Sequence, residues 1–313
     1  MERWVAVRRG AAFGAAVALT PYLVIKVFWV FGALLGLLPP GEGMSVAAFV
    51  TLNVVTIGMA GTGIVLALGL ARRRATGPAR PLIVVAWIGS GLLVPMLPFL
   101  VVTFLLGGTS LPGGTEDGGA ATWEDVLLSV SFFGMGLGLA IAVPLYLRER
   151  WPGTFRDAAP RGRGAVLAMA GAGFVGLLGV YWAAGGTLGL AHPAWRDGAW
   201  RLLTGNTALW SLAGLWAVAA LTGDRPPRWI AVVAAWVSSG LLFAWSAWKL
   251  PLTGYLAVSG DGSTVWPEHL AVAALQDVAG IAAGLAMFAV TLRASGGLRP
   301  GGKVPAGSSP RLS

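Results

Sequence analysis

A chain of 313 residues that is 56% hydrophobic and only 11% charged has too little polar surface for a water-soluble fold, so the lipid bilayer must be its solvent. The formal net charge of +9 would suit nucleic-acid binding in a soluble protein, but here the basic residues fall between apolar runs, which predicts no nucleic-acid partner. The absence of cysteine excludes disulfides, thiolate metal sites and cysteine nucleophiles.

Eight apolar runs are long enough to cross a membrane as α-helices, which takes about 20 residues each. The alternation of apolar and polar residues that is typical of a transmembrane β-barrel is absent. The sequence therefore predicts an all-α integral membrane protein with eight transmembrane helices. In chain order, the predicted spans are residues 11–38, 47–71, 81–106, 126–147, 166–190, 207–222, 229–248 and 270–292.

The basic residues between the spans predict how the chain crosses the membrane. Eighteen of the 22 lysines and arginines precede the first span or follow the second, fourth, sixth or eighth. Because positive residues concentrate on the cytoplasmic side, this arrangement predicts a multi-pass protein of the cell membrane with both termini in the cytoplasm. Residues 296–313 are rich in Gly, Pro and Ser, which predicts a disordered cytoplasmic tail.

Short segments of the first half recur in the second half. WVFGALLGL at 29–37 matches WAAGGTLGL at 182–190, and AWIGSGLL at 86–93 recurs as AWVSSGLL at 235–242. We therefore predict two tandem four-helix repeats. Because each repeat crosses the membrane an even number of times, the two would be parallel and related by an axis along the membrane normal. The predicted repeats comprise residues 1–150 and 151–295.

One of these segments resembles a known family. The stretch VYWAAGGTLGL at 180–190 is similar to the first helix of a small, uncharacterised family of four-helix actinobacterial membrane proteins, which share a Tyr-x-Trp-Ala-x-Gly-Gly-x-x-Gly-Leu pattern. In the first half the pattern is degraded, with Phe28 in place of the tyrosine. The resemblance implies that the chain is two fused copies of such a unit. It implies no activity, because the family has none established.

Glycine pairs at four-residue spacing occur in both halves. Small residues at this spacing let membrane helices approach closely, so we interpret the pairs as helix-packing positions. A phosphate-binding glycine loop would need a preceding strand, which the sequence does not offer. The predicted packing residues are Gly32 with Gly36, Gly134 with Gly138, Gly185 with Gly189, and Gly280 with Gly284.

Only two charged residues fall inside the predicted spans, Lys26 in the first and Asp277 in the last. Charge within the hydrocarbon region is costly and is usually paired or functional. Counted along the helices, both residues lie in the outer half of the membrane, where they could form a buried pair. Three interpretations stay open: a structural pair, a functional site for an ion, proton or substrate, or no contact, with Lys26 reaching toward the headgroups.

Polar residues and prolines within the spans mark candidate positions along a pathway. Asn53 and Asn206 hold equivalent places in the two halves, where interhelical hydrogen bonding is the favoured role and pathway lining is the alternative. Tyr22 follows Pro21, which removes a backbone amide from the first helix. The prolines of the third span could open a cavity in the same way.

No catalytic or metal-binding pattern is recognisable in the sequence. His192 and His269, the only histidines, lack the spacing and the number of converging ligands that zinc requires. No serine triad, nucleotide-binding loop or prenyl-diphosphate motif is present. We therefore assign no catalytic residue, no metal and no cofactor.

These features support three functional hypotheses. The first is a module, not driven by ATP, that binds or transports a small or lipophilic molecule and uses Lys26 and Asp277 for coupling to a proton or ion. The second is a membrane-embedded enzyme acting on an isoprenoid or lipid, with Asp277 as general acid. The third is a scaffold or accessory subunit of another membrane protein. The expected partners are the lipid bilayer and, for the first two, a lipophilic ligand.

Overall fold

The computed structural model describes residues 2–38, 45–72, 79–105, 123–150, 161–223, 228–259 and 267–294, and the predicted tail at 296–313 lies outside them. Eight helices are long and apolar enough to cross a membrane, which confirms the predicted all-α, multi-span class. The third of these spans is broken into α3 and α4. The helices are α1 (Glu2–Leu34), α2 (Val46–Ala71), α3 (Ala79–Leu93), α4 (Met96–Leu105), α5 (Trp123–Arg150), α6 (Arg163–Ala183), α7 (Gly198–Thr222), α8 (Arg228–Ser259) and α9 (Leu270–Ala294).

Several helices extend beyond the predicted spans, because polar residues at the membrane interface can continue a helix past its hydrocarbon-facing part. α1 begins at Glu2 and α8 continues to Ser259. α7 begins at Gly198, where the Asp197 side chain caps its first turn. The fifth helix, by contrast, ends before its predicted span does. α6 ends at Ala183, and the residues that follow form a turn.

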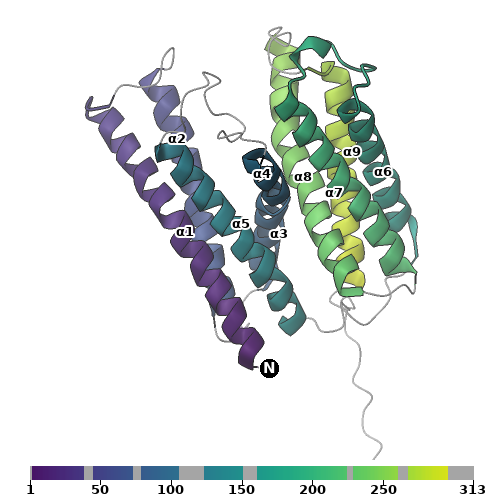
Figure 1. The fold of residues 1–313 in the computed structure, drawn as a ribbon, viewed down its shortest axis with the longest axis horizontal. Helices are drawn as coiled ribbons and strands as arrows, with labels where there is room; N and C mark the ends of the chain where they lie inside the picture. Colours follow the sequence, from purple (N-terminus) through teal and green to yellow (C-terminus); the bar gives the residue numbers. More distant parts are fainter. Residues whose placement is uncertain are drawn as a thin grey trace, which may run out of the picture.

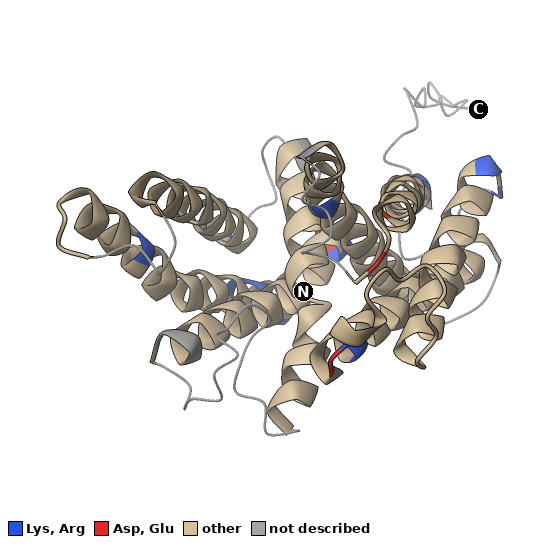
Figure 2. Cartoon of the chain, turned by 90° about the horizontal axis from the view of Figure 1, so that it is seen from above, with Lys and Arg blue, Asp and Glu red and all other residues tan. Residues whose placement is uncertain are grey.

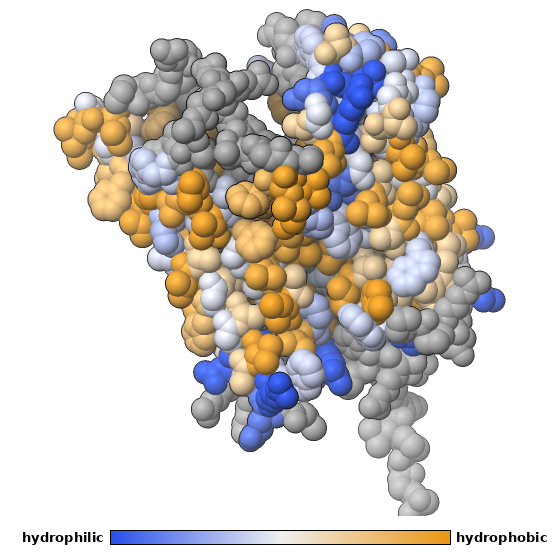
Figure 3. All heavy atoms as spheres, in the orientation of Figure 1, coloured by the Kyte–Doolittle hydropathy of each residue, from blue (hydrophilic) through white to orange (hydrophobic). Residues whose placement is uncertain are grey.

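The helices form two groups that stand side by side (Figure 1). α1, α2 and α5 pack on one another in the first group, and α6, α7, α8 and α9 form a four-helix bundle in the second. Few helical residues are charged (Figure 2), and apolar side chains cover much of the face drawn in Figure 3. α3 packs more extensively on α8 than on any helix of its own half. The two groups therefore meet through α3 and α8.

Arg8 joins three helices of the first group at the end where α1 begins. Its side chain is fully buried, and its guanidinium donates to the backbone oxygens of Leu70 and, at 3.0 Å, of Arg72, which the end of α2 leaves without helical partners. The same guanidinium pairs with Glu149 of α5 at 3.2 Å and lies 5.9 Å from the centroid of the Tyr146 ring. These contacts fix the ends of α1, α2 and α5 relative to one another.

A reciprocal pair of hydrogen bonds joins α3 to α8. The indole N–H of Trp87 donates to the hydroxyl of Ser239 at 2.8 Å. The indole N–H of Trp236 donates to the hydroxyl of Ser90, also at 2.8 Å. All four side chains are buried, and they occupy matching places in the AWIGSGLL and AWVSSGLL segments. The contact is therefore self-complementary, as in a two-fold symmetric interface.

The backbones of α3 and α8 touch where these segments cross. A Cβ atom added to Gly91 would overlap the backbone of Gly240, and one added to Gly240 would lie 2.6 Å from the carbonyl oxygen of Trp87. A larger residue at either position would push the helices apart. Phe288 of α9 stacks on the Trp87 ring with a centroid distance of 4.2 Å, so the crossing is also packed against the core of the second group.

We expect Gly91→Ala to destabilise the protein by about 1–3 kcal/mol, the usual cost of adding volume to a close-packed contact. Gly89→Ala is the control on the same helix, because its new Cβ would lie 3.6 Å from Leu66 and 3.8 Å from Leu139, in ordinary contact. Thermal unfolding in detergent, followed by tryptophan fluorescence, measures the difference. Equal midpoints for the two variants would contradict the close crossing of α3 and α8.

Candidate functional site

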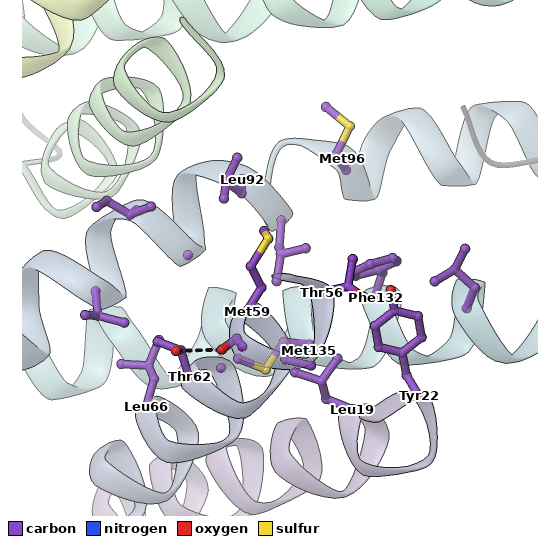
Figure 4. A pocket seen from close by; sticks show the side chains of 18 of the residues that line it. Leu19, Tyr22, Thr56, Met59, Thr62, Leu66, Leu92, Met96, Phe132 and Met135 are labelled. Carbon is purple, nitrogen blue, oxygen red and sulfur yellow. Dashed lines mark hydrogen bonds between the residues drawn. The ribbon is translucent and has the colours of Figure 1, made fainter. Parts of the chain in front are cut away.

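A cavity of about 770 Å³ lies among the helices of the first group (Figure 4). It is partly enclosed, and its walls come from α1 to α5 with one residue, Trp245, from α8. Its volume is typical of sites that hold small organic molecules. Ten of its lining residues are labelled in Figure 4: Leu19, Tyr22, Thr56, Met59, Thr62, Leu66, Leu92, Met96, Phe132 and Met135.

The cavity exists because α2 and α3 barely touch. α3 is held by α8, and its helix stops before Pro95, whose backbone lacks the amide that the helical ladder needs. α4 continues the span after this break. Leu93 and Met96, on either side of the break, both form part of the cavity wall.

Gly61 of α2 and Gly214 of α7 are aligned by the same sequence offset as Asn53 and Asn206, and they have different surroundings. Gly214 of α7 packs directly on α8 and α9, so that an added Cβ would lie 2.7 Å from Ser238 and 2.8 Å from Met287. Gly61 stands at the matching position of α2, and no described atom lies within 4 Å of where its Cβ would be. Gly214 therefore packs between helices of the second group, whereas Gly61 does not, and Gly61 is not among the residues of the cavity wall.

The cavity walls are mainly apolar. Thr56 Oγ1 donates to the backbone oxygen of Asn53 at 2.9 Å, and Thr62 Oγ1 donates to that of Gly58 at 2.8 Å, so α2 satisfies both hydroxyls itself. The Tyr22 hydroxyl shares a hydrogen bond with the Thr56 side chain. No charged side chain is among the described residues of the wall. The described part of the wall therefore suits an apolar molecule with a small polar group.

The two asparagines have different partners. Asn206 of α7 donates from Nδ2 to the backbone oxygen of Pro95 at 2.9 Å, in a buried contact that ties the break between α3 and α4 to the second group. Asn53 donates to the backbone oxygen of Phe49 in its own helix at 2.8 Å, and its Oδ1 has no donor within the described ranges. Neither asparagine lines the cavity, whereas Tyr22 does.

Lys26 and Asp277 lie in different groups, so the structure does not bring them together (Figure 1). The Lys26 ammonium lies over the ring of Trp29, 3.9 Å from its centroid. Asp277 is buried in the second group, where the charged residues that act on it electrostatically are Lys249 of α8 and Glu268, before α9. Lys249 lies one residue beyond the predicted seventh span, so its position in the sequence does not point to a place near a buried carboxylate.

Four of the predicted packing glycines lie in close helix contacts. Cβ atoms added to Gly134 and Gly138 of α5 would lie 2.5 Å from alanine side chains of α1. Cβ atoms added to Gly280 and Gly284 of α9 would collide with α8. Larger residues at these four positions would separate α1 from α5 and α8 from α9.

The other four glycines do not pack one helix on another, which corrects the prediction. α1 and α6 end early, so Gly36, Gly185 and Gly189 lie in turns, with φ angles of 70°, 106° and 85° that glycine adopts without strain. Gly32 is helical, but an added Cβ there would meet Leu38 of the turn that follows the same helix. These glycines therefore lie at helix ends. A glycine pair at a helix end can show the same four-residue spacing as a glycine pair on a packing face.

The family-like segment at 180–190 forms a compact cap at the end of the molecule opposite the N-terminus. The Tyr181 hydroxyl accepts hydrogen bonds from the backbone amides of Thr187 and Leu188, at 3.2 and 3.1 Å. The indole of Trp182 donates to the Leu188 carbonyl at 2.9 Å. The side chains of Tyr181 and Trp182 thus stabilise the turn through hydrogen bonds to its backbone.

Among the residues that the structure describes, no group of three His, Asp or Glu side chains could hold a metal ion.

Sequence reasoning missed the polar residues that join the helices. Arg8 was interpreted through topology alone, although it is buried among three helices. The serine three residues after each repeated tryptophan was a usable signal, because a buried indole N–H needs an acceptor. The missed residues are Arg8, Trp87, Ser90, Trp236, Ser239 and Lys249.

Comparisons with known proteins add no relative, since no family model, curated protein or solved structure matches the chain.

We expect Asn206→Leu to destabilise the protein by about 1 kcal/mol, because the Pro95 carbonyl would lose its donor within the membrane. Asn53→Leu is the matched control, since it removes only a hydrogen bond within α2. Unfolding in mixed micelles with increasing SDS measures both. If Asn206→Leu unfolds at the SDS fraction of the wild type, the asparagine does not hold the helix break in place.

Proposed function

We propose that this protein binds a lipophilic molecule from the membrane in the cavity of the first group. The observation that carries the proposal is the separation of α2 from α3, which leaves an apolar cavity of about 770 Å³ among membrane-spanning helices.

The walls favour one class of ligand. Met59, Met96 and Met135 are flexible and polarizable, so they can adapt to an apolar molecule of irregular shape. Tyr22 and Thr56 supply a polar spot on one side of the cavity. A long or branched apolar molecule with a hydroxyl or carbonyl group at one end fits this arrangement.

The ligand would enter from the lipid through the gap between α2 and α3. All described wall residues belong to helices that are apolar enough to span the membrane. Val55 and Met59 of α2 belong to the wall and are also 46% and 54% exposed, so they lie where the cavity meets the surface. A lateral entrance spares an apolar molecule any passage through water.

We expect a long-chain fatty acid carrying a diazirine, photolysed in vesicles that contain the protein, to label residues of the cavity wall. Met59→Trp should remove most of this labelling, because the indole would occupy the entrance. Met59→Leu should leave it unchanged, because the two side chains have similar volumes. Mass spectrometry of the labelled peptides identifies the positions.

Two results would count against ligand binding in this cavity. The first is labelling spread evenly over the outward-facing residues of both groups, as expected for lipid that only surrounds the protein. The second is cavity labelling that is the same in Met59→Trp and the wild type.

We also propose that the two groups are parallel tandem repeats with both termini in the cytoplasm. The reciprocal hydrogen bonds between the two AW-containing segments support the repeat. The contacts of Arg8 and Arg9 with the end of α2 support the orientation, because they gather basic residues at one end of the molecule.

Because the chain has no cysteine, single-cysteine variants can test the orientation. Gly162 precedes α6, and Gly198 begins α7 after the loop that follows α6. Both are exposed, and no described atom lies within 4 Å of an added Cβ at either position. We expect a membrane-impermeant maleimide to label Gly198→Cys in intact cells, and Gly162→Cys only after the cells are opened. The reverse order would invert the proposed topology.

A further inference from the structure

A basic surface lies at the end of the first group where α1 begins, and Figure 3 shows hydrophilic residues gathered at this end. The guanidinium of Arg148 on α5 lies over the ring of Trp4 on α1, 5.9 Å from the ring centroid. Both side chains are exposed, and so is Arg3, which precedes Trp4. α1 and α5 therefore present two arginines and an indole ring beside their contact.

The positive charge of this surface is not balanced by the acidic residues around it. Glu149 follows Arg148 in the sequence, but its carboxylate pairs with the buried Arg8 at 3.2 Å. Glu2 lies about 200° around α1 from Trp4, on the other side of the helix. Within the described ranges, neither Arg3 nor Arg148 forms an ion pair with a carboxylate. Two positive charges therefore remain at the surface.

Apolar side chains continue the surface from the arginines toward the middle of the membrane. Val7 lies one turn along α1 from Arg3 and is exposed. Ile141 lies two turns before Arg148 on α5 and is also exposed. Tryptophan favours the level of the lipid headgroups, so Trp4 marks the boundary between the charged and the apolar part. A molecule bound here meets positive charge at one end and apolar side chains along the rest.

We propose that the surface formed by Arg3, Trp4 and Arg148 binds an anionic phospholipid. The two guanidinium groups contact the phosphate, which arginine binds well, and the acyl chains lie along the apolar side chains of α1 and α5. A zwitterionic headgroup brings its own positive charge, so it would leave the arginines poorly balanced. The site is separate from the cavity, because none of these three residues lines the cavity wall.

Native mass spectrometry of the full-length protein in nonionic detergent counts the bound phospholipids and gives their dissociation constants. We expect the wild type to bind phosphatidylglycerol more tightly than phosphatidylcholine with the same acyl chains. Arg3→Gln and Arg148→Gln should each weaken the binding of phosphatidylglycerol about fivefold, the contribution of one arginine near an anionic headgroup. Neither substitution should change the binding of phosphatidylcholine.

Arg163→Gln is the matched control, because Arg163 is an exposed arginine at the start of α6 and its loss changes the net charge equally. It should leave the binding of phosphatidylglycerol unchanged. All three arginines are exposed, so the variants should fold, and thermal unfolding in the same detergent checks this.

Three results would overturn the proposal. The first is equal affinity of the wild type for the two phospholipids. The second is an equal loss of affinity in Arg148→Gln and Arg163→Gln, which would indicate attraction by net charge alone. The third is displacement of phosphatidylglycerol by an equal concentration of inorganic phosphate, because the acyl chains would then contribute nothing to binding.

Discussion

The arrangement of the helices depends on the crossing of α3 and α8. Apolar surface does not by itself bring helices together in a bilayer, because lipid tails are as apolar as leucine, so close packing and hydrogen bonds must do so. At this crossing both are present. The contact between Gly91 and Gly240 brings the backbones together, and this approach places each indole N–H within 2.8 Å of a serine hydroxyl on the other helix. With no water to compete, such bonds hold α3 to the second group.

The cavity follows from that attachment. A helix has a limited surface, and α3 uses much of its surface for α8 and little for α2. At the break before Pro95, the hydrogen bond from Asn206 to the Pro95 carbonyl also joins the start of α4 to the second group. α2 is left beside α1 and α5, and the space that α3 would fill in a closed bundle becomes the cavity. In the second group, by contrast, Gly214 of α7 packs directly on α8 and α9.

The class of protein and the number of spans could be predicted from the sequence, because the thickness of the hydrocarbon core fixes the length of an apolar run. Helix ends were harder, since α8 continues through Lys249 even though a charge there suggests the edge of the membrane. The glycine pairs were ambiguous because four-residue spacing suits both a packing face, as at Gly280, and a helix end, as at Gly185. The cavity and the partner of Asp277 could not be predicted, because both depend on which helices are neighbours.

α8 takes part in the crossing of the two groups, in the cavity wall and in the surroundings of the buried Asp277. It crosses α3 at Gly240, its Trp245 forms part of the cavity wall, and Lys249 lies one turn further along, beside Asp277. Trp245 of the cavity wall and Lys249 are therefore contributed by the same helix, one turn apart. Lys26, which the sequence suggested as the partner of Asp277, lies on α1 in the other group, with its ammonium over the ring of Trp29.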